Sequence, residues 1–253
     1  MKFWKNNINI SYEAVKDYSY ERYKSYERFG FVKNIMQKRL RRTGDFLDIG
    51  CAKGEFICYL KSFYPEIDFT GIDISDKLIR LARREPKLRD VKFIRTDAQK
   101  FNLNRKFDFV LMSGVLAIFD DYRQLLNRMA RHIKLGGWGY IFGYFTEEDI
   151  DVLVRYRNNY LGSKVWESGL NMFSLITIRR ALGAFSDHIK FYKFHLSKDL
   201  AKKKNPILSY TLNTREKGKI VLNGANILNQ FYLVEFRNEK YKSNYERSQG
   251  IIT

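Results

Sequence analysis

Short apolar runs alternate with amphipathic stretches through the middle of the chain. Five runs rich in Phe, Ile, Leu and Val predict strands at residues 46–50, 69–73, 91–95, 107–112 and 138–144. The stretches between them place apolar side chains at helical spacing and predict helices at residues 56–63, 77–84 and 122–133. Gly136 and Gly137 are expected to stop the last of these helices. Strands separated by helices are typical of a parallel, doubly wound α/β sheet.

The two ends of the chain extend this frame. Residues 12–28 are polar and tyrosine-rich and predict a helix, which Gly30 interrupts before a second helix at residues 31–40. Further elements are expected after the fifth strand: a helix at residues 175–185 and strands at residues 189–196 and 231–236. The pattern between these two strands predicts a hairpin, formed by residues 207–212 and 219–222. The predicted organisation is an N-terminal helical lid at 1–43, a main domain at 44–240 with an insertion at 197–230, and a tail at 241–253.

Composition narrows the class of protein. The net charge of +18 favours anionic partners, either nucleic acid or phosphorylated metabolites or an acidic membrane surface. A competing interpretation is a compositional bias toward Lys, Asn, Ile, Phe and Tyr without function. No apolar run approaches the ~20 residues of a membrane span, and residues 1–10 have no apolar signal-peptide core. With two cysteines and three histidines we expect a reduced, cytoplasmic protein with no metal site.

A ligand site is expected where the first strand meets its helix. The segment from Asp48 to Gly54 contains Gly50 and Gly54, which allow a tight turn and a close approach of the backbone to a ligand. In an open α/β sheet ligands bind at the carboxyl ends of the strands. A dinucleotide fingerprint would need glycine at positions 52 and 55, where this chain has Ala52 and Glu55.

Two acidic residues follow the next strands. Asp73 ends the second strand, and its carboxylate can accept both hydroxyls of a ribose. Asp97 follows the third strand, where it can accept a hydrogen bond from an adenine amino group. Each alone is more often a helix cap than a ligand contact, but their order and spacing predict a nucleoside-bearing ligand.

These residues resemble the class I S-adenosylmethionine (SAM) dependent methyltransferase superfamily. The matching segments are Phe46 to Gly54, Gly71 to Ser75, Thr96 to Ala98, Phe107 to Ser113 and Ile133 to Gly137. The resemblance covers roughly Gly44 to Tyr144 and continues more loosely to Phe236. It implies a Rossmann-like, seven-stranded, mostly parallel sheet with helices on both faces and an antiparallel last strand. Two departures are Ala52, where glycine is common, and Leu135, where proline is common.

The resemblance also implies SAM as cofactor and a set of cofactor-binding residues. Gly50 and Gly54 would lie beside the methionine part, Asp73 on the ribose and Asp97 on the adenine. The full set comprises Asp48, Gly50, Cys51, Gly54, Asp73, Ile74, Asp97, Ala98 and Ser113.

The methyl acceptor is expected over the ends of the fourth and fifth strands. Candidate catalytic residues there are Tyr144 and His195, whereas His132 is expected at a helix C-terminus and His188 in a loop or at a strand start. Asp120 and Asp121 are expected to cap the helix that follows them.

A small anionic acceptor is the leading hypothesis for the substrate. An antiparallel last strand would put the basic insertion at 197–230 over the active face, and the substrate candidates are Tyr12, Tyr20, Tyr23, Lys202 and Lys203. Similarity to bacterial surface-polysaccharide enzymes suggests a phosphorylated or nucleotide-linked sugar, in capsule or lipopolysaccharide synthesis. The alternatives are an RNA methyltransferase, supported by the charge, and an N-methyltransferase of a phosphorylated amine. No Pro-Pro-Tyr type motif follows the fourth strand, and the oligomeric state stays open.

Overall fold

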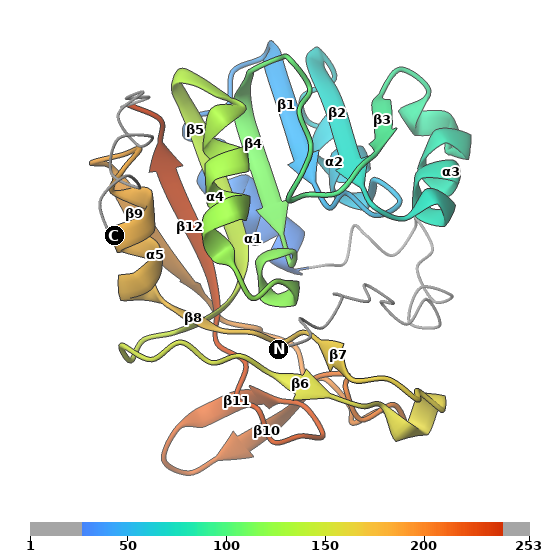
Figure 1. Ribbon diagram of the computed structural model, residues 1–253, viewed down its shortest axis with the longest axis vertical. Coiled ribbons are helices and arrows are strands. Elements are labelled where there is room, and N and C mark those ends of the chain that lie inside the picture. The colour runs from blue at the N-terminus through green and yellow to red at the C-terminus, as the bar shows by residue number, and fades with distance from the viewer. Residues whose placement is uncertain (1–26, 240–253) are drawn as a thin grey trace, which may run out of the picture.

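A twisted, mostly parallel sheet forms the centre of the molecule (Figure 1). The computed structural model describes residues 27–239. The strand order is β3-β2-β1-β4-β5-β12-β9. The strands are β1 (Gly44–Ile49), β2 (Ile67–Asp73), β3 (Lys92–Arg95), β4 (Phe107–Ser113), β5 (Ile133–Thr146), β9 (Ile189–Phe194) and β12 (Phe231–Arg237). Strand β12 is antiparallel to both of its neighbours, and β1 to β5 pair in parallel. The expected seven-stranded, Rossmann-like sheet is confirmed, and the short β8 (Phe173–Ser174) adds a further strand beside β5.

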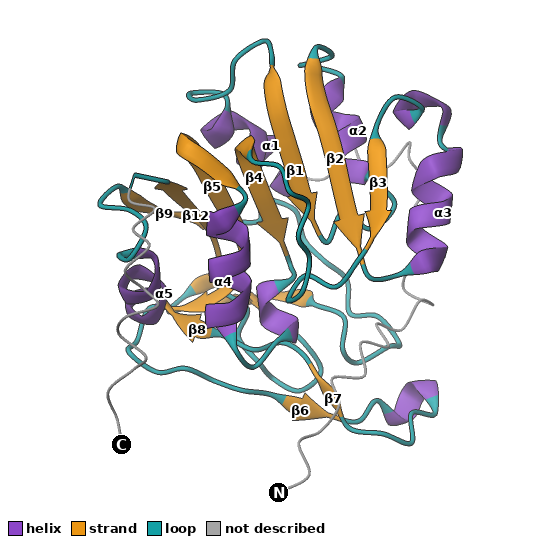
Figure 2. Cartoon of the chain, turned by 45° about the horizontal axis from the view of Figure 1, so that its top comes forward, coloured by secondary structure: helices purple, strands orange, loops and turns teal. Residues whose placement is uncertain are grey.

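Helices cover both faces of the sheet (Figure 2). They are α1 (Glu27–Met36), α2 (Glu55–Lys61), α3 (Asp76–Arg84), α4 (Tyr122–Arg131) and α5 (Leu175–Leu182), with 3-10 turns at Pro86–Leu88, Leu116–Ile118 and Asn159–Leu161. Apolar residues of α1, α2 and α3 pack in one core cluster with β1 and β2. Those of α4 and α5 pack in a second cluster on the opposite face. Burial on both faces leaves the carboxyl edge of the sheet as the place for a ligand.

Two sequence expectations about helix ends were wrong. Gly30 does not interrupt a helix, because α1 runs through it from Glu27 to Met36. Phe29, just before it, is buried and packs edge-on against Phe56 of α2 with ring centroids 5.2 Å apart. Gly136 and Gly137 do not stop α4 either, since α4 ends at Arg131 and β5 begins at Ile133.

Two insertions form a layer beyond the carboxyl ends of the parallel strands (Figure 1). The first follows β5 and contains the short strands β6 (Arg155–Tyr156) and β7 (Glu167–Ser168). The second lies between β9 and β12 and contains the expected hairpin, as β10 (Tyr210–Thr214) and β11 (Gly218–Leu222). A hydrogen bond from Asn158 Nδ2 to Asn205 Oδ1 (3.0 Å) joins the two insertions. The apolar pattern predicted the second insertion, but no element of the first.

Among residues 27–239, no helix has the length and apolar character needed to cross a membrane.

Candidate functional site

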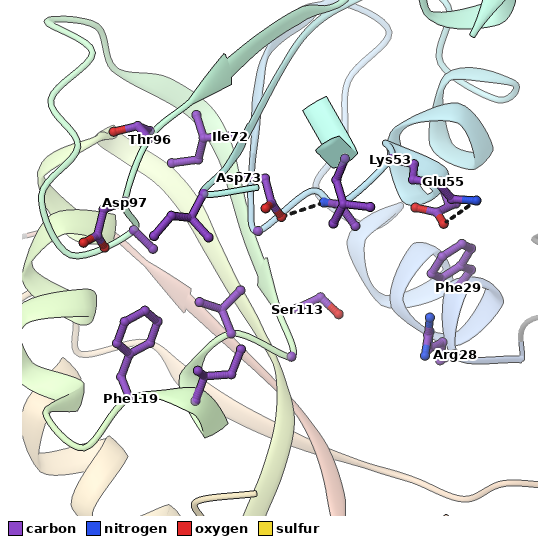
Figure 3. A pocket seen from close by; sticks show the side chains of 18 residues that line it. Arg28, Phe29, Lys53, Glu55, Ile72, Asp73, Thr96, Asp97, Ser113 and Phe119 are labelled. Carbon is purple, nitrogen blue, oxygen red and sulfur yellow. Dashed lines mark hydrogen bonds and ion pairs between the residues drawn. The ribbon is translucent and has the colours of Figure 1, made fainter. Parts of the chain in front are cut away.

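A cavity of about 250 Å³ opens at the carboxyl ends of β1 to β4. Figure 3 shows Asp73, Asp97 and Ser113 around this space, with Arg28 and Phe29 reaching it from α1. The residues that line it are Arg28, Phe29, Gly50, Ala52, Lys53, Glu55, Ile72, Asp73, Ile74, Leu78, Thr96, Asp97, Ala98, Ser113, Gly114, Val115, Ile118 and Phe119. The strand-end residues expected from sequence therefore meet in one place. We call this space the first cavity.

The turn after β1 needs glycine at its first position. Gly50 has a φ of +76°, and a Cβ there would lie 2.2 Å from Val115 Cγ2. Ala52 also has positive φ, +50°, a left-handed conformation that costs an alanine about 1–2 kcal/mol. Its backbone N–H donates to Asp73 Oδ2 at 3.0 Å. That hydrogen bond holds the strained loop against the end of β2.

Asp73 lies at the centre of the first cavity. Its Oδ1 accepts the N–H of Ser75 at 2.8 Å, so each carboxylate oxygen accepts a backbone N–H, and the backbone of Ile74 contributes a further hydrogen bond. Burial raises the pKa of Asp73, while the backbone hydrogen bonds from Ser75, Ala52 and Ile74 act in the opposite direction. Each oxygen keeps a lone pair free of the bonds from Ala52 and Ser75. Asp73 can therefore accept two further hydroxyl donors, as a ribose would supply.

A planar group fits between the ends of β2 and β3. Asp97 lines the first cavity, and its Oδ1 accepts the N–H of Gln99 at 2.8 Å in a local turn that does not use Oδ2. Ile74 is 37% exposed although it is apolar, and Phe119 lines the same space. An acceptor between two apolar walls suits the edge of an adenine ring.

Acidic groups dominate the floor beneath the first cavity. Asp48 is 3% exposed, and burial, followed by the charges of Asp73 and Glu55, raises its pKa to about 8. Lys53 forms an ion pair with Glu55 at 3.6 Å, and both are buried. A ligand that carries positive charge would relieve the repulsion among these carboxylates. The residues present thus fit a nucleoside that bears a cationic, amino-acid-like tail.

Six of the nine expected cofactor residues line the first cavity: Gly50, Asp73, Ile74, Asp97, Ala98 and Ser113. The other three, Asp48, Cys51 and Gly54, are buried and do not line it. Gly54 is the N-cap residue of α2, and its φ of +80° favours glycine. Any other residue there would place its Cβ within 3 Å of the Leu88 and Phe93 side chains. Arg28 and Phe29 were not foreseen, since no local motif shows that α1 passes the sheet edge.

The candidate catalytic residues lie beyond the first cavity. Tyr144 is near the carboxyl end of β5, and its ring contacts Phe231 of β12 with centroids 4.8 Å apart. His195 directly follows β9 and lines a second cavity, of about 500 Å³. Tyr12, Tyr20 and Tyr23 lie outside the described residues.

The remaining polar candidates occupy varied positions. Lys202 and Lys203 are exposed, and the Lys202 ammonium sits 5.3 Å from the centre of the Tyr210 ring. His132 ends α4, as expected. Asp121 caps α4 through the N–H of Arg123, but Asp120 does not. Asp120 instead pairs with Arg155 and accepts from Asn171 Nδ2 (3.1 Å), so it anchors the first insertion.

Comparison with known proteins identifies the central part of the chain. A family model described as a methyltransferase domain matches residues 46–137, from β1 into β5. Malonyl-[acyl-carrier protein] O-methyltransferase of Acetivibrio thermocellus is 30% identical over 122 residues, 45% of this chain and 43% of that protein. dTDP-4-amino-2,3,4,6-tetradeoxy-D-glucose N,N-dimethyltransferase of Saccharopolyspora spinosa is 28% identical over 131 residues, 49% and 51% of the two chains. The chain thus matches about half the length of these curated relatives.

Solved structures match over a longer range. The PH0226 protein from Pyrococcus horikoshii OT3 superposes with a TM-score of 0.56 at 17% identity, covering 89% of this chain and 98% of that one. At this identity the likeness concerns the fold. It extends the correspondence beyond residue 137, to the strands that complete the sheet.

Proposed function

We propose that this chain, which carries a class I SAM-dependent methyltransferase domain, transfers the methyl group of SAM to a small anionic acceptor. The acceptor class we favour is a phosphorylated or nucleotide-linked sugar, or a related phospho-compound. One observation supports methyl transfer above the others. Asp73, Asp97 and the Gly50 turn meet around a single cavity at the carboxyl edge of the sheet.

The proposed roles of the cofactor residues follow from their contacts. Asp73 would accept the two ribose hydroxyls while its backbone partners hold it in place. Asp97 would accept the adenine amino group, with Ile74 against one ring face. The acidic floor formed by Asp48 and Glu55 would favour the positive charge of the methionine part. SAM supplies a methyl group activated by its sulfonium; the chain's residues bind, orient and exclude water.

The acceptor would approach over the ends of β4 and β5. Ser113 and Gly114 line the first cavity on that side, and Ser113 pairs with Phe142 of β5. Tyr144 and His195 remain the candidates for contact with the reacting group. An oxygen acceptor requires a base or prior ionisation, whereas a neutral amine requires only orientation. The N-terminal residues, with Tyr12, Tyr20 and Tyr23, are proposed to close over this side as a lid.

Charge and one relative support the choice of acceptor class. The net charge of +18 favours anions, and the Saccharopolyspora spinosa relative is named for a nucleotide-linked amino sugar. A role in cytoplasmic synthesis of surface polysaccharide precursors would be consistent with such a substrate. The alternatives are RNA and a phosphorylated amine, and both belong in the assay.

A transfer assay with labelled SAM tests the proposal. Panels of phosphorylated sugars, nucleotide sugars, phosphorylated amines and RNA would be compared, with the Asp73→Ala variant as the inactive control. We expect label in a phosphorylated small molecule and a strong loss in the variant. Label in a neutral acceptor only would contradict the anionic class, and label in RNA only would establish the runner-up.

A further inference from the structure

A second cavity lies at the outer edge of the same face, between the end of the sheet and the β10–β11 hairpin. Its volume is about 500 Å³, a size typical of small-molecule sites. Its lining residues are Lys193, Phe194, His195, Leu196, Lys217, Lys219, Ile220, Val221, Leu228, Asn229, Gln230 and Phe231. They come from β9, the hairpin and the start of β12, which converge only in the folded chain.

The charge of this second cavity is one-sided. Lys193, Lys217 and Lys219 line it together with His195, and no carboxylate is among its described lining residues. Two of the lysines form ion pairs with carboxylates that do not line the cavity. Lys193 pairs with Glu147 at 2.6 Å, and Lys219 pairs with Asp199 at 2.8 Å. Lys217, beside the hairpin turn, forms no ion pair with any described carboxylate. The second cavity therefore offers a cationic charge to an incoming anion.

Aromatic rings form another part of the wall. Phe194 and Phe231 line the second cavity, are partly exposed, and lie edge to face, with ring centroids 6.2 Å apart and an interplanar angle of 84°. Behind them, Phe142 stacks on Phe231 at 6.0 Å, and Phe31 of α1 contacts Phe194 at 5.1 Å. Rings supported in this way provide a fixed surface on which a planar base can stack.

A buried amide completes the set. Asn229 is 5% exposed and donates from Nδ2 to Ser209 Oγ at 3.0 Å, while its Oδ1 has no hydrogen-bond partner among the described residues. Buried acceptors without partners are rare and costly in proteins. Asn229 lines the second cavity, so a rotation of its side chain would present this oxygen to an N–H group of a ligand.

We propose that the second cavity binds the nucleoside diphosphate part of the acceptor, with the diphosphate at Lys217 and the base stacked on the Phe194 ring, its edge against Phe231. This inference rests on the proposed function and identifies the part of the acceptor that the chain would bind. Three strand spacings, ~14 Å, separate β4 at the first cavity from β9 at the second. A sugar joined to a nucleoside through a diphosphate spans a gap of this order, so the sugar would lie at the end of β4.

Calorimetry with thymidine diphosphate as the probe tests the inference. Titrations would be made on the full chain saturated with S-adenosylhomocysteine, and pyrophosphate and thymidine would be titrated separately. We expect thymidine diphosphate to bind more tightly than either part. In Lys217→Ala its dissociation constant should rise about tenfold, because a charge-assisted contact to phosphate is lost. Phe194→Leu should weaken thymidine diphosphate and thymidine, but not pyrophosphate.

Lys87→Ala is the matched control, since Lys87 is exposed and lines neither the first nor the second cavity. It should leave all three affinities unchanged. Equal affinity of Lys217→Ala and the unchanged chain for thymidine diphosphate would overturn the inference, as would tighter binding of pyrophosphate than of thymidine diphosphate. S-adenosylhomocysteine binding separates the two proposals. Binding of S-adenosylhomocysteine without binding of thymidine diphosphate would contradict this inference alone. Failure to bind S-adenosylhomocysteine would contradict the proposed function.

Discussion

Asp73 combines a structural role with a proposed binding role in one carboxylate. Its two oxygens hold the backbone of Ala52 and Ser75 and face the first cavity. Asp73→Ala should remove two charge-assisted hydrogen bonds to the ribose and weaken SAM binding by ~2–4 kcal/mol. Asp76→Ala is the control, because Asp76 is on the neighbouring helix and pairs with Arg80 outside the first cavity. If isothermal titration gives the same SAM affinity for both variants, the assignment of Asp73 to the ribose is wrong.

Asp48 makes stability depend on pH through its raised pKa. Burial raises this pKa to about 8, whereas an unfolded aspartate loses its proton near pH 4. Between these values the folded chain binds an extra proton, so the free energy of unfolding falls as pH rises through the window. Asp73 acts in the same direction. Burial lowers the pKa of His132, which opposes the trend below about pH 6.5.

Asp48→Asn isolates this contribution. Urea unfolding of the ligand-free chain should show a steeper loss of stability from pH 5.5 to 8 in the unchanged protein than in the variant. The contributions of His132 and Asp73 largely cancel in that comparison. Parallel stability curves would mean that Asp48 is ionised in the folded chain.

Helix α1 connects three parts of the molecule at the element scale. Glu27 accepts hydrogen bonds from the backbone and hydroxyl of Ser197 at 2.7 and 2.8 Å, which ties the helix to the second insertion. Burial acts to raise the pKa of Glu27, but these bonds together hold it below its usual range. Phe31 supports the rings behind the second cavity, and Arg28 and Phe29 line the first. One short helix thus contacts both proposed sites.

Phe29 anchors this helix. It is 6% exposed and contacts Phe56, so Phe29→Ala should lower the free energy of unfolding by about 3–5 kcal/mol. Asn34→Ala, at an exposed position of the same helix, should change it by less than about 0.5 kcal/mol. Urea denaturation measures both. A small loss in Phe29→Ala would mean that α1 is held mainly by its other contacts.

The lid hypothesis is tested by removing residues 1–26. This cut keeps α1 from Glu27 onward, including the buried Phe29. We expect a folded chain that binds SAM but has lost most of its turnover, because the acceptor would no longer be enclosed. Circular dichroism and calorimetry establish folding and cofactor binding before activity is measured. Full activity in a folded truncation would refute the lid.

The distribution of charge matters at the scale of the whole molecule. Lys202, Lys203 and Lys204 are exposed and line neither cavity, so their proposed role is attraction at a distance. Replacing all three by alanine should lower kcat/KM for the acceptor about two- to fivefold at low salt, with SAM affinity unchanged. The difference should vanish near 0.5 M salt, because ions screen charges within a few ångströms. If kcat/KM for the acceptor does not differ at low salt, these lysines are solvated surface residues with no role in attracting the acceptor.

The response of acceptor binding to salt also separates a small acceptor from RNA. A diphosphate makes one or two charged contacts, so the KM of the unchanged chain should rise only weakly with salt. RNA makes many phosphate contacts, which would give a steep dependence. A steep slope would favour the runner-up function and explain the charge of +18 by nucleic acid.

Local sequence patterns determined the sheet of this protein and the residues that meet at its carboxyl edge. Apolar runs, glycine at the turn and acids at strand ends are short-range features, so β1 to β5 and the set of Gly50, Asp73 and Asp97 could be predicted. The tertiary structure decided what no short segment encodes. Gly30 stays helical because Phe29, beside it, packs against the buried ring of Phe56. Asp120 does not cap α4, because it pairs with Arg155 from a segment distant in sequence. Lys217, Phe194 and Phe231 meet because an antiparallel β12 returns the chain beside β9, a pairing that depends on contacts distant in sequence.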